Sequence, residues 1–182
     1  MYDAFNSTFI TLIPKSDSPR TYNEFRPISL CNCIYNIIAK SIANRLKPIL
    51  SENISLEQFS FLNHHQIHEA IRTAQCILHS IKIKRIKGMI LKIDFAKAFD
   101  QTRCLYLRML LTHLGFPIAF INSIIWCISN VSYSVFINGF SSPFFRAEWA
   151  LRQGFRLSPL SFLLVMEGLS QTISQETRLS KL

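Results

Sequence analysis

The feature that most constrains this chain is the stretch of residues 88–100, where an apolar run ends in a carboxylate. The run Met-Ile-Leu-Lys-Ile at 89–93 predicts a strand too apolar for one exposed face, and Asp94 follows it directly. A charge at the end of a buried strand is costly unless another group pairs with it. Asp94 is therefore a candidate metal ligand, and the alternative is that it caps a following helix.

Composition favours one folded domain with a basic surface. The chain has 182 residues, of which 49% are hydrophobic, so a sizeable core is expected. Lysine and arginine exceed acidic residues by a formal charge of +9. That excess suits polyanions such as nucleic acid, although charge alone fits a merely basic protein equally well.

The spacing of the cysteines argues against a zinc-ribbon or CxxC redox protein, and the pattern of apolar residues argues against a membrane-spanning protein. The five cysteines have neither zinc-ribbon nor CxxC spacing, which predicts reduced thiols in an intracellular compartment. Residues 109–145 carry no charged side chain, but Gly115, Pro117 and Asn138-Gly139 interrupt them. No membrane span is therefore expected, because the unbroken apolar piece is too short to cross a bilayer.

The periodicity of apolar residues predicts a mixture of helices and strands. Asn138-Gly139 is a strong hairpin signal, and Gly115 suits the position just after a helix. Pro48 is expected to end the first helix. The expected helices are 34–48, 66–81, 102–114, 117–128 and 158–171, and the expected strands are 9–14, 89–93, 132–137 and 144–151. This layout is α+β, with no linker that would mark a domain boundary.

Several sequence blocks in a fixed order resemble one family. They are Leu12–Lys15, Asn23–Leu30, Leu91–Asp100, Asn138-Gly139, Leu151–Gly154 and Leu157–Pro159. Together they closely resemble the reverse-transcriptase domain of LINE-type (non-LTR) retrotransposons, especially those common in plants. The resemblance covers roughly residues 9–170. It implies the fingers (about 1–87) and a partial palm (about 88–182) of a right-hand polymerase, with an incomplete antiparallel palm sheet.

The resemblance also implies roles for individual residues. Asp94 matches the family's first Mg²⁺-binding aspartate. It is the one catalytic residue that the resemblance implies for this chain. Phe99 matches an aromatic steric gate against ribonucleotides, its alternative being a plain core residue. The resemblance also implies a set of nucleotide-binding residues. Lys15 and Arg26 would contact the triphosphate, and the backbone carbonyl of Phe95 would support the metals. Phe99 and the Gln153-Gly154 loop would pack against the nucleotide. The two cations have a simpler alternative as solvated surface charges.

The activity implied is RNA-directed DNA polymerisation. A deoxynucleotide would be transferred to a DNA primer 3′-OH on an RNA template, with two Mg²⁺ ions activating the hydroxyl and stabilising the leaving pyrophosphate. The partners expected are therefore template, primer and deoxynucleotides, with no membrane, in the nucleus or cytoplasm. Oligomeric state is left open.

The sequence departs from the family pattern at important places. The family needs a later aromatic-x-Asp-Asp motif, but no aspartate follows Asp100, and no thumb, endonuclease or RNase H segment is recognised. Phe155 and Arg156 replace the Asp and Pro of the family's block, and a bulky Phe155 is expected to disturb nucleotide handling. We therefore expect an inactive remnant. The alternatives are a catalytically silent RNA- or DNA-binding protein and a pseudogene product with no function.

Overall fold

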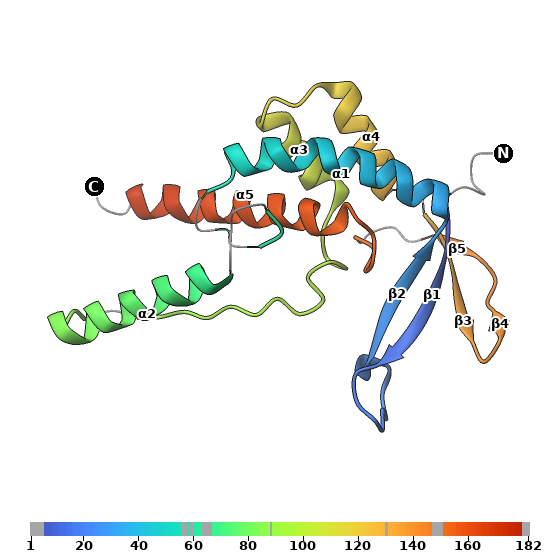
Figure 1. Cartoon of the computed structure of the whole chain (residues 1–182), viewed down its shortest axis with the longest axis horizontal. Helices are drawn as coiled ribbons and strands as arrows, with labels where there is room; N and C mark the ends of the chain where they lie inside the picture. Colours follow the sequence, from blue (N-terminus) through green and yellow to red (C-terminus); the bar gives the residue numbers. More distant parts are fainter. Residues whose placement is uncertain are drawn as a thin grey trace.

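Five helices and a small sheet build the α+β fold expected from the sequence (Figure 1). The computed structural model describes residues 6–55, 58, 60–62, 67–87, 89–129, 131–146 and 151–179. The helices are α1 (Cys33–Asn53), α2 (Ile67–Lys84), α3 (Cys104–His113), α4 (Ile118–Ile128) and α5 (Ser158–Leu179).

The sheet extends away from the helical body (Figure 1). Its strands are β1 (Ser7–Pro14), β2 (Phe25–Cys31), β3 (Ser132–Ile137), β4 (Phe140–Ser141) and β5 (Phe145–Arg146), and a 3-10 turn, η2 (Tyr22–Glu24), precedes β2. Antiparallel pairing joins β1 to β2, and parallel pairing joins β1 to β3. The two short strands β4 and β5 both pair with β3 in antiparallel fashion. The sheet is therefore mixed.

The hairpin predicted at Asn138-Gly139 is confirmed. Both residues have positive φ, 50° and 85°, as a two-residue turn between twisted strands requires. Asparagine and glycine tolerate this backbone region better than other residues. The turn joins β3 to β4, and the return strand expected over 144–151 is described only as β5, because residues 147–150 lie outside the described part of the chain.

The hydrophobic core lies among α1, α3, α4 and α5. Fully buried side chains come from each of these helices, for example Leu46, Leu107, Ile124 and Leu160. The α3–α4 connection is set by Gly115, with φ of 76°, whose N–H donates to the Thr112 carbonyl. These helices thus form a framework that carries the loops of the candidate site.

Three helices run further than the sequence predicted, and α2 does so only slightly, ending at Lys84 instead of near residue 81. The first was expected to end at Pro48, but α1 continues to Asn53. A proline removes one helical hydrogen bond, yet Leu46 and Leu50 on either side are fully buried, so packing keeps the helix intact. The last helix, expected to end near Gln171, continues to Leu179.

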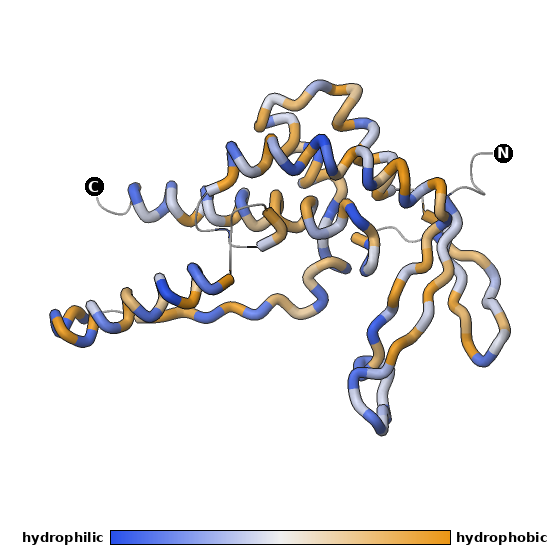
Figure 2. The backbone as a smooth tube through the Cα atoms, in the orientation of Figure 1, coloured by the Kyte–Doolittle hydropathy of each residue, from blue (hydrophilic) through white to orange (hydrophobic). Residues whose placement is uncertain are grey.

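The strand predicted at residues 89–93 is wrong. These residues are exposed and without regular secondary structure, and the preceding helix α2 contains no buried residue. Helix α2 and residues 89–93 lie apart from the core, and Figure 2 shows apolar residues along both of them. A strand needs a neighbour to take its backbone hydrogen bonds, and none of the described strands pairs with this segment.

The contact between α3 and α5 yields a first prediction. A β-carbon at Gly168 would lie 2.6 Å from Tyr106 Oη and 2.8 Å from Leu110 Cδ2. We expect Gly168→Ala to lower the free energy of unfolding by about 1–2 kcal/mol through overpacking. Urea denaturation measures this, with Ser174→Ala on the exposed face of the same helix as control. A Gly168→Ala protein as stable as that control would contradict the close approach.

Candidate functional site

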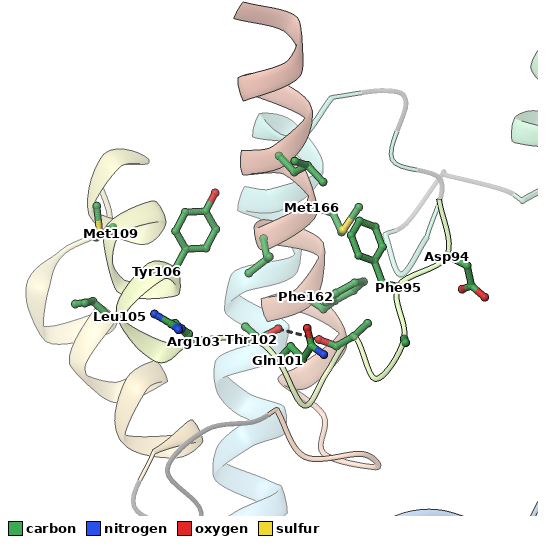
Figure 3. A pocket seen from close by; sticks show the side chains of 14 residues that line it. Asp94, Phe95, Gln101, Thr102, Arg103, Leu105, Tyr106, Met109, Phe162 and Met166 are labelled. Carbon is green, nitrogen blue, oxygen red and sulfur yellow. Dashed lines mark hydrogen bonds between the residues drawn. The ribbon is translucent and has the colours of Figure 1, made fainter. Parts of the chain in front are cut away.

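Asp94 and Phe95 lie beside a cavity between residues 94–103, α3 and α5 (Figure 3). The cavity has a volume of about 670 Å³, and its walls are mainly apolar side chains, among them Leu105, Met109 and Phe162. The Asp94 side chain is exposed and points away from the two helices in Figure 3. Asp94 is thus a solvent-facing carboxylate at the rim.

The segment after Asp94 forms a tight turn, not a helix. Lys97 has φ of 51°, and the Asp100 N–H donates to the Lys97 carbonyl at 2.9 Å. The next helix, α3, begins only at Cys104, so neither Asp94 nor Asp100 caps it. Burial raises the pKa of Asp100, and nearby Lys97 opposes that rise.

The structure brings Phe99, Gln153 and Gly154 together around a second cavity of about 500 Å³. The Phe99 carbonyl accepts a hydrogen bond from the Leu151 N–H at 2.8 Å, and the Phe99 ring packs against Phe162 at 5.3 Å. Three of the predicted nucleotide-binding residues therefore share one surface. Phe99 also packs against the core, as the alternative interpretation of this residue expects, and its role as a steric gate stays a prediction.

The Gln153-Gly154 loop is held against β2. The Ser29 N–H donates to the Gln153 carbonyl at 3.0 Å. Gly154 has φ of 90°, and a β-carbon there would lie 3.4 Å from the Ser29 carbonyl oxygen. Glycine is suited to this position because the conformation is strained for other residues and the approach to β2 is close.

Phe155 lies in the core beneath the Gln153-Gly154 loop and lines the second cavity. Its side chain is only 2% exposed and stacks on Tyr35 at a ring distance of 5.5 Å. The ring contributes to the wall of the second cavity but is anchored in the core. Phe155 therefore extends the hydrophobic core beneath the loop.

Arg152 is the structural residue that the sequence analysis missed. Its side chain is 3% exposed and lies between Tyr35 and Phe155, with Cζ 4.7 Å and 4.3 Å from the two ring centres. It donates to five acceptors: Asn6 Oδ1, Thr8 Oγ1, Cys31 Sγ, Tyr35 Oη and the Cys127 carbonyl. None of its described partners is a carboxylate, so neutral oxygens and aromatic faces stabilise this buried cation.

Burial raises the pKa of two groups around Arg152, the Tyr35 hydroxyl and the Cys127 thiol. Desolvation raises the pKa of the Tyr35 hydroxyl, and the nearby guanidinium opposes the rise. Tyr35 Oη donates to the Cys127 carbonyl at 2.6 Å while it accepts from Arg152 at 3.0 Å. Desolvation also raises the pKa of the Cys127 thiol. The cluster is therefore a buried hydrogen-bond network around the Arg152 guanidinium.

Lys15 and Arg26 lie on the β1–β2 hairpin and are exposed. Lys15 Nζ donates to the Asn23 carbonyl at 2.8 Å. In the connecting loop, the Arg20 N–H and the Thr21 hydroxyl lower the pKa of Glu24. Across the described residues, no hydrogen bond or ion pair links either cation to Asp94 or Phe99. The predicted nucleotide-binding set is thus only partly assembled.

The donors around Asp94 do not make a complete metal site. No group of three or more His, Cys, Asp or Glu side chains gathers anywhere in the described residues. Mg²⁺ requires near-octahedral oxygen coordination, of which Asp94 supplies one carboxylate. The described residues therefore do not by themselves fit a two-metal centre.

Sequence comparison decides the family. A family model described as reverse transcriptase (RNA-dependent DNA polymerase) matches residues 13–181. The chain belongs to the reverse transcriptase family. Reverse transcriptases generally use a divalent metal. The expected resemblance to non-LTR retrotransposon proteins is confirmed by the three relatives described next. No helix in the described ranges is long and apolar enough to span a membrane.

Three curated relatives match most of this reverse transcriptase chain. It is 28% identical over 158 residues to the transposon TX1 uncharacterized 149 kDa protein of Xenopus laevis, covering 87% of this chain and 12% of the relative. It is 29% identical to the Pol polyprotein of retrotransposable element R2DM of Drosophila melanogaster, with coverages of 90% and 15%. The Nasonia vitripennis R2 polyprotein is 25% identical, with coverages of 91% and 16%. The chain thus spans about one-eighth to one-sixth of these proteins.

The buried guanidinium of Arg152 gives a second prediction. We expect Arg152→Met to lower the free energy of unfolding by about 2 kcal/mol or more, because buried acceptors lose their donor. Arg152→Lys should recover only part of the loss, since one ammonium cannot reproduce the planar fork. Urea denaturation measures both variants, with the exposed Arg156→Met as control. Equal stabilities of Arg152→Met and the control would contradict a structural role.

Proposed function

We propose that this chain forms the fingers (about residues 1–87) and the first part of the palm (about 88–182) of a reverse transcriptase. The observation that carries the proposal is the convergence of Phe99, Gln153 and Gly154 on one cavity, within a chain of that family. A planar aromatic ring beside an amide and an open glycine backbone suits a sugar and base. The exposed cations Lys15 and Arg26 suit a triphosphate.

We further propose that the 182-residue chain does not polymerise by itself. Asp94 supplies one carboxylate, and the sequence after it contains only one further aspartate, Asp100, which is half-buried. Phosphoryl transfer depends on stabilising the charge that develops at the reacting phosphate. In this proposal, catalysis with magnesium, an RNA template, a DNA primer and deoxynucleotides requires further carboxylates besides Asp94.

A primer-extension assay tests this proposal. The chain is incubated with an RNA template, an annealed DNA primer, deoxynucleotides and Mg²⁺, and we expect no detectable extension. Asp94→Asn serves as the matched variant, because it removes the carboxylate charge with little change in shape. Extension by the unaltered chain that Asp94→Asn abolishes would sink the inactive interpretation and establish a working site.

The second candidate function is nucleic-acid binding without catalysis, favoured by the +9 charge and the exposed cations of the β1–β2 hairpin. We expect single-stranded RNA to bind more weakly as salt increases, with a slope of about −0.7 in log K per phosphate contacted. Replacing Lys15 and Arg26 together by glutamine should reduce the slope by about 1.4.

Fluorescence anisotropy at several salt concentrations measures this binding. The control replaces Lys40 and Arg45, two exposed cations of α1, by glutamine and so removes the same charge elsewhere. An equal effect of the two double variants would assign binding to overall charge. Absence of binding at low salt would eliminate this second function.

A further inference from the structure

The wall of the second cavity carries positive charge and no negative charge. Arg152 and Arg156 line this cavity, whereas no acidic side chain does. Arg156 is exposed and makes no hydrogen bond or ion pair with the described part of the chain. None of the described hydrogen-bond partners of buried Arg152 is a carboxylate. An anion in the cavity would therefore meet two cations whose charges the described residues do not pair.

Two buried donors at this cavity lack an acceptor. Ser158 and Arg152 are 1% and 3% exposed, and both line the cavity. Within the described residues, Ser158 Oγ and Arg152 Nε make no hydrogen bond, although both terminal nitrogens of the same guanidinium do. Buried donors are almost always paired, because leaving one unpaired costs free energy. These two unpaired donors therefore point to a ligand that has acceptor oxygens.

The cavity wall also includes the N-terminus of a long helix. α5 begins at Ser158, which lines the cavity, and runs for 22 residues. Just before it, the N–H groups of Arg156 and Leu157 donate to no acceptor in the described ranges. Aligned peptide dipoles give a helix N-terminus a partial positive charge, and free N–H groups there bind anions. The helix, the hydroxyl and the guanidinium groups thus favour the same kind of ligand.

We propose that the second cavity binds a phosphate group at the N-terminus of α5. Arg156 supplies charge, while the Ser158 hydroxyl and the N–H groups before the helix donate hydrogen bonds. The buried charge of Arg152 adds to the attraction through space. This site differs from the triphosphate contacts proposed for Lys15 and Arg26, which lie on the β1–β2 hairpin.

The cavity suits a phosphate that belongs to a nucleotide unit. Its volume of about 500 Å³ lies within the range of about 300–1,000 Å³ that is common for small-ligand sites. Phe99 and Phe155 line it beside the two arginines, and nucleotides combine a stacking surface with phosphate charge. The inference deepens the proposed function and rests on it for the nucleotide unit. A phosphodiester of a strand and the triphosphate of a free nucleotide both present the group that binds here.

Isothermal titration calorimetry with inorganic phosphate tests the proposal, in buffer without Mg²⁺, template or primer. We expect Arg156→Gln to weaken phosphate binding about tenfold, because a charge-assisted hydrogen bond is lost. Ser158→Ala should weaken it about fivefold, because one neutral donor is lost. This measurement reports binding alone, so its result does not depend on whether the chain polymerises.

Two substitutions serve as matched controls. Ser161 Oγ is also buried in α5 without a described partner, but Ser161 does not line the cavity, so Ser161→Ala should leave phosphate binding unchanged. Lys40→Gln removes an exposed charge from α1 and should also leave it unchanged. Urea denaturation without ligand should show all four variants at least as stable as the unaltered chain, because none of the groups removed makes a described hydrogen bond.

Two further probes identify the source of the phosphate. If a strand phosphodiester occupies the site, Arg156→Gln should reduce the salt slope of single-stranded RNA binding by about 0.7, measured by fluorescence anisotropy. If a free nucleotide occupies it, the same variant should bind deoxyadenosine triphosphate about tenfold more weakly in calorimetry, with the RNA slope unchanged.

Four results would overturn the proposal. The first two are absence of phosphate binding by the unaltered chain and equal effects of Ser158→Ala and Ser161→Ala. The third is a change confined to inorganic phosphate, with RNA and deoxyadenosine triphosphate unaffected, which would mean an adventitious ion only. The fourth is loss of phosphate binding in Lys15→Gln/Arg26→Gln, which would place the site on the β1–β2 hairpin. Retained phosphate binding in that double variant separates this site from the proposed triphosphate contacts.

Discussion

The rest of the structure depends on the contacts that the buried guanidinium of Arg152 makes. It joins the residue before β1, β1 itself, the end of β2, α1 and the end of α4 through hydrogen bonds, and it lies between two aromatic rings. Its position directly before Gln153 means that the same contacts hold the loop that lines the Phe99 cavity. The sheet, the helical core and the Gln153-Gly154 loop are therefore all held by Arg152, whose charge is stabilised by hydrogen bonds to neutral oxygens.

The two halves of the candidate site differ in how firmly they are built. The Gln153-Gly154 loop is hydrogen-bonded to β2 and rests on buried Phe155, while Asp94 lies on an exposed segment without a neighbouring strand. A carboxylate in a metal centre must be held in a fixed position by its surroundings. In the described residues, Asp94 has no neighbouring strand that would hold it in this way.

Much of the fold and part of the site could be predicted from the sequence. Apolar spacing located the helices, and Asn138-Gly139 located a hairpin, because both signals depend on local backbone geometry. Of the nucleotide-binding residues that the resemblance implies, Phe99, Gln153 and Gly154 line one cavity, and their role there stays a prediction. Prediction failed at Pro48, where buried leucines outweigh one lost hydrogen bond, and at residues 89–93, where an apolar run has no partner. Arg152 was missed because no local pattern distinguishes a buried arginine from a surface one.

The sequence by itself determined the family and the α+β class, since these follow from local patterns and from ordered motifs. Tertiary structure decided which of those residues meet. It buried Arg152 and Phe155 beneath the loop, and it left Asp94 and its apolar neighbours exposed. The physical reason is that strand pairing and charge burial depend on groups far apart in the chain, and no local pattern records whether the distant partner is present.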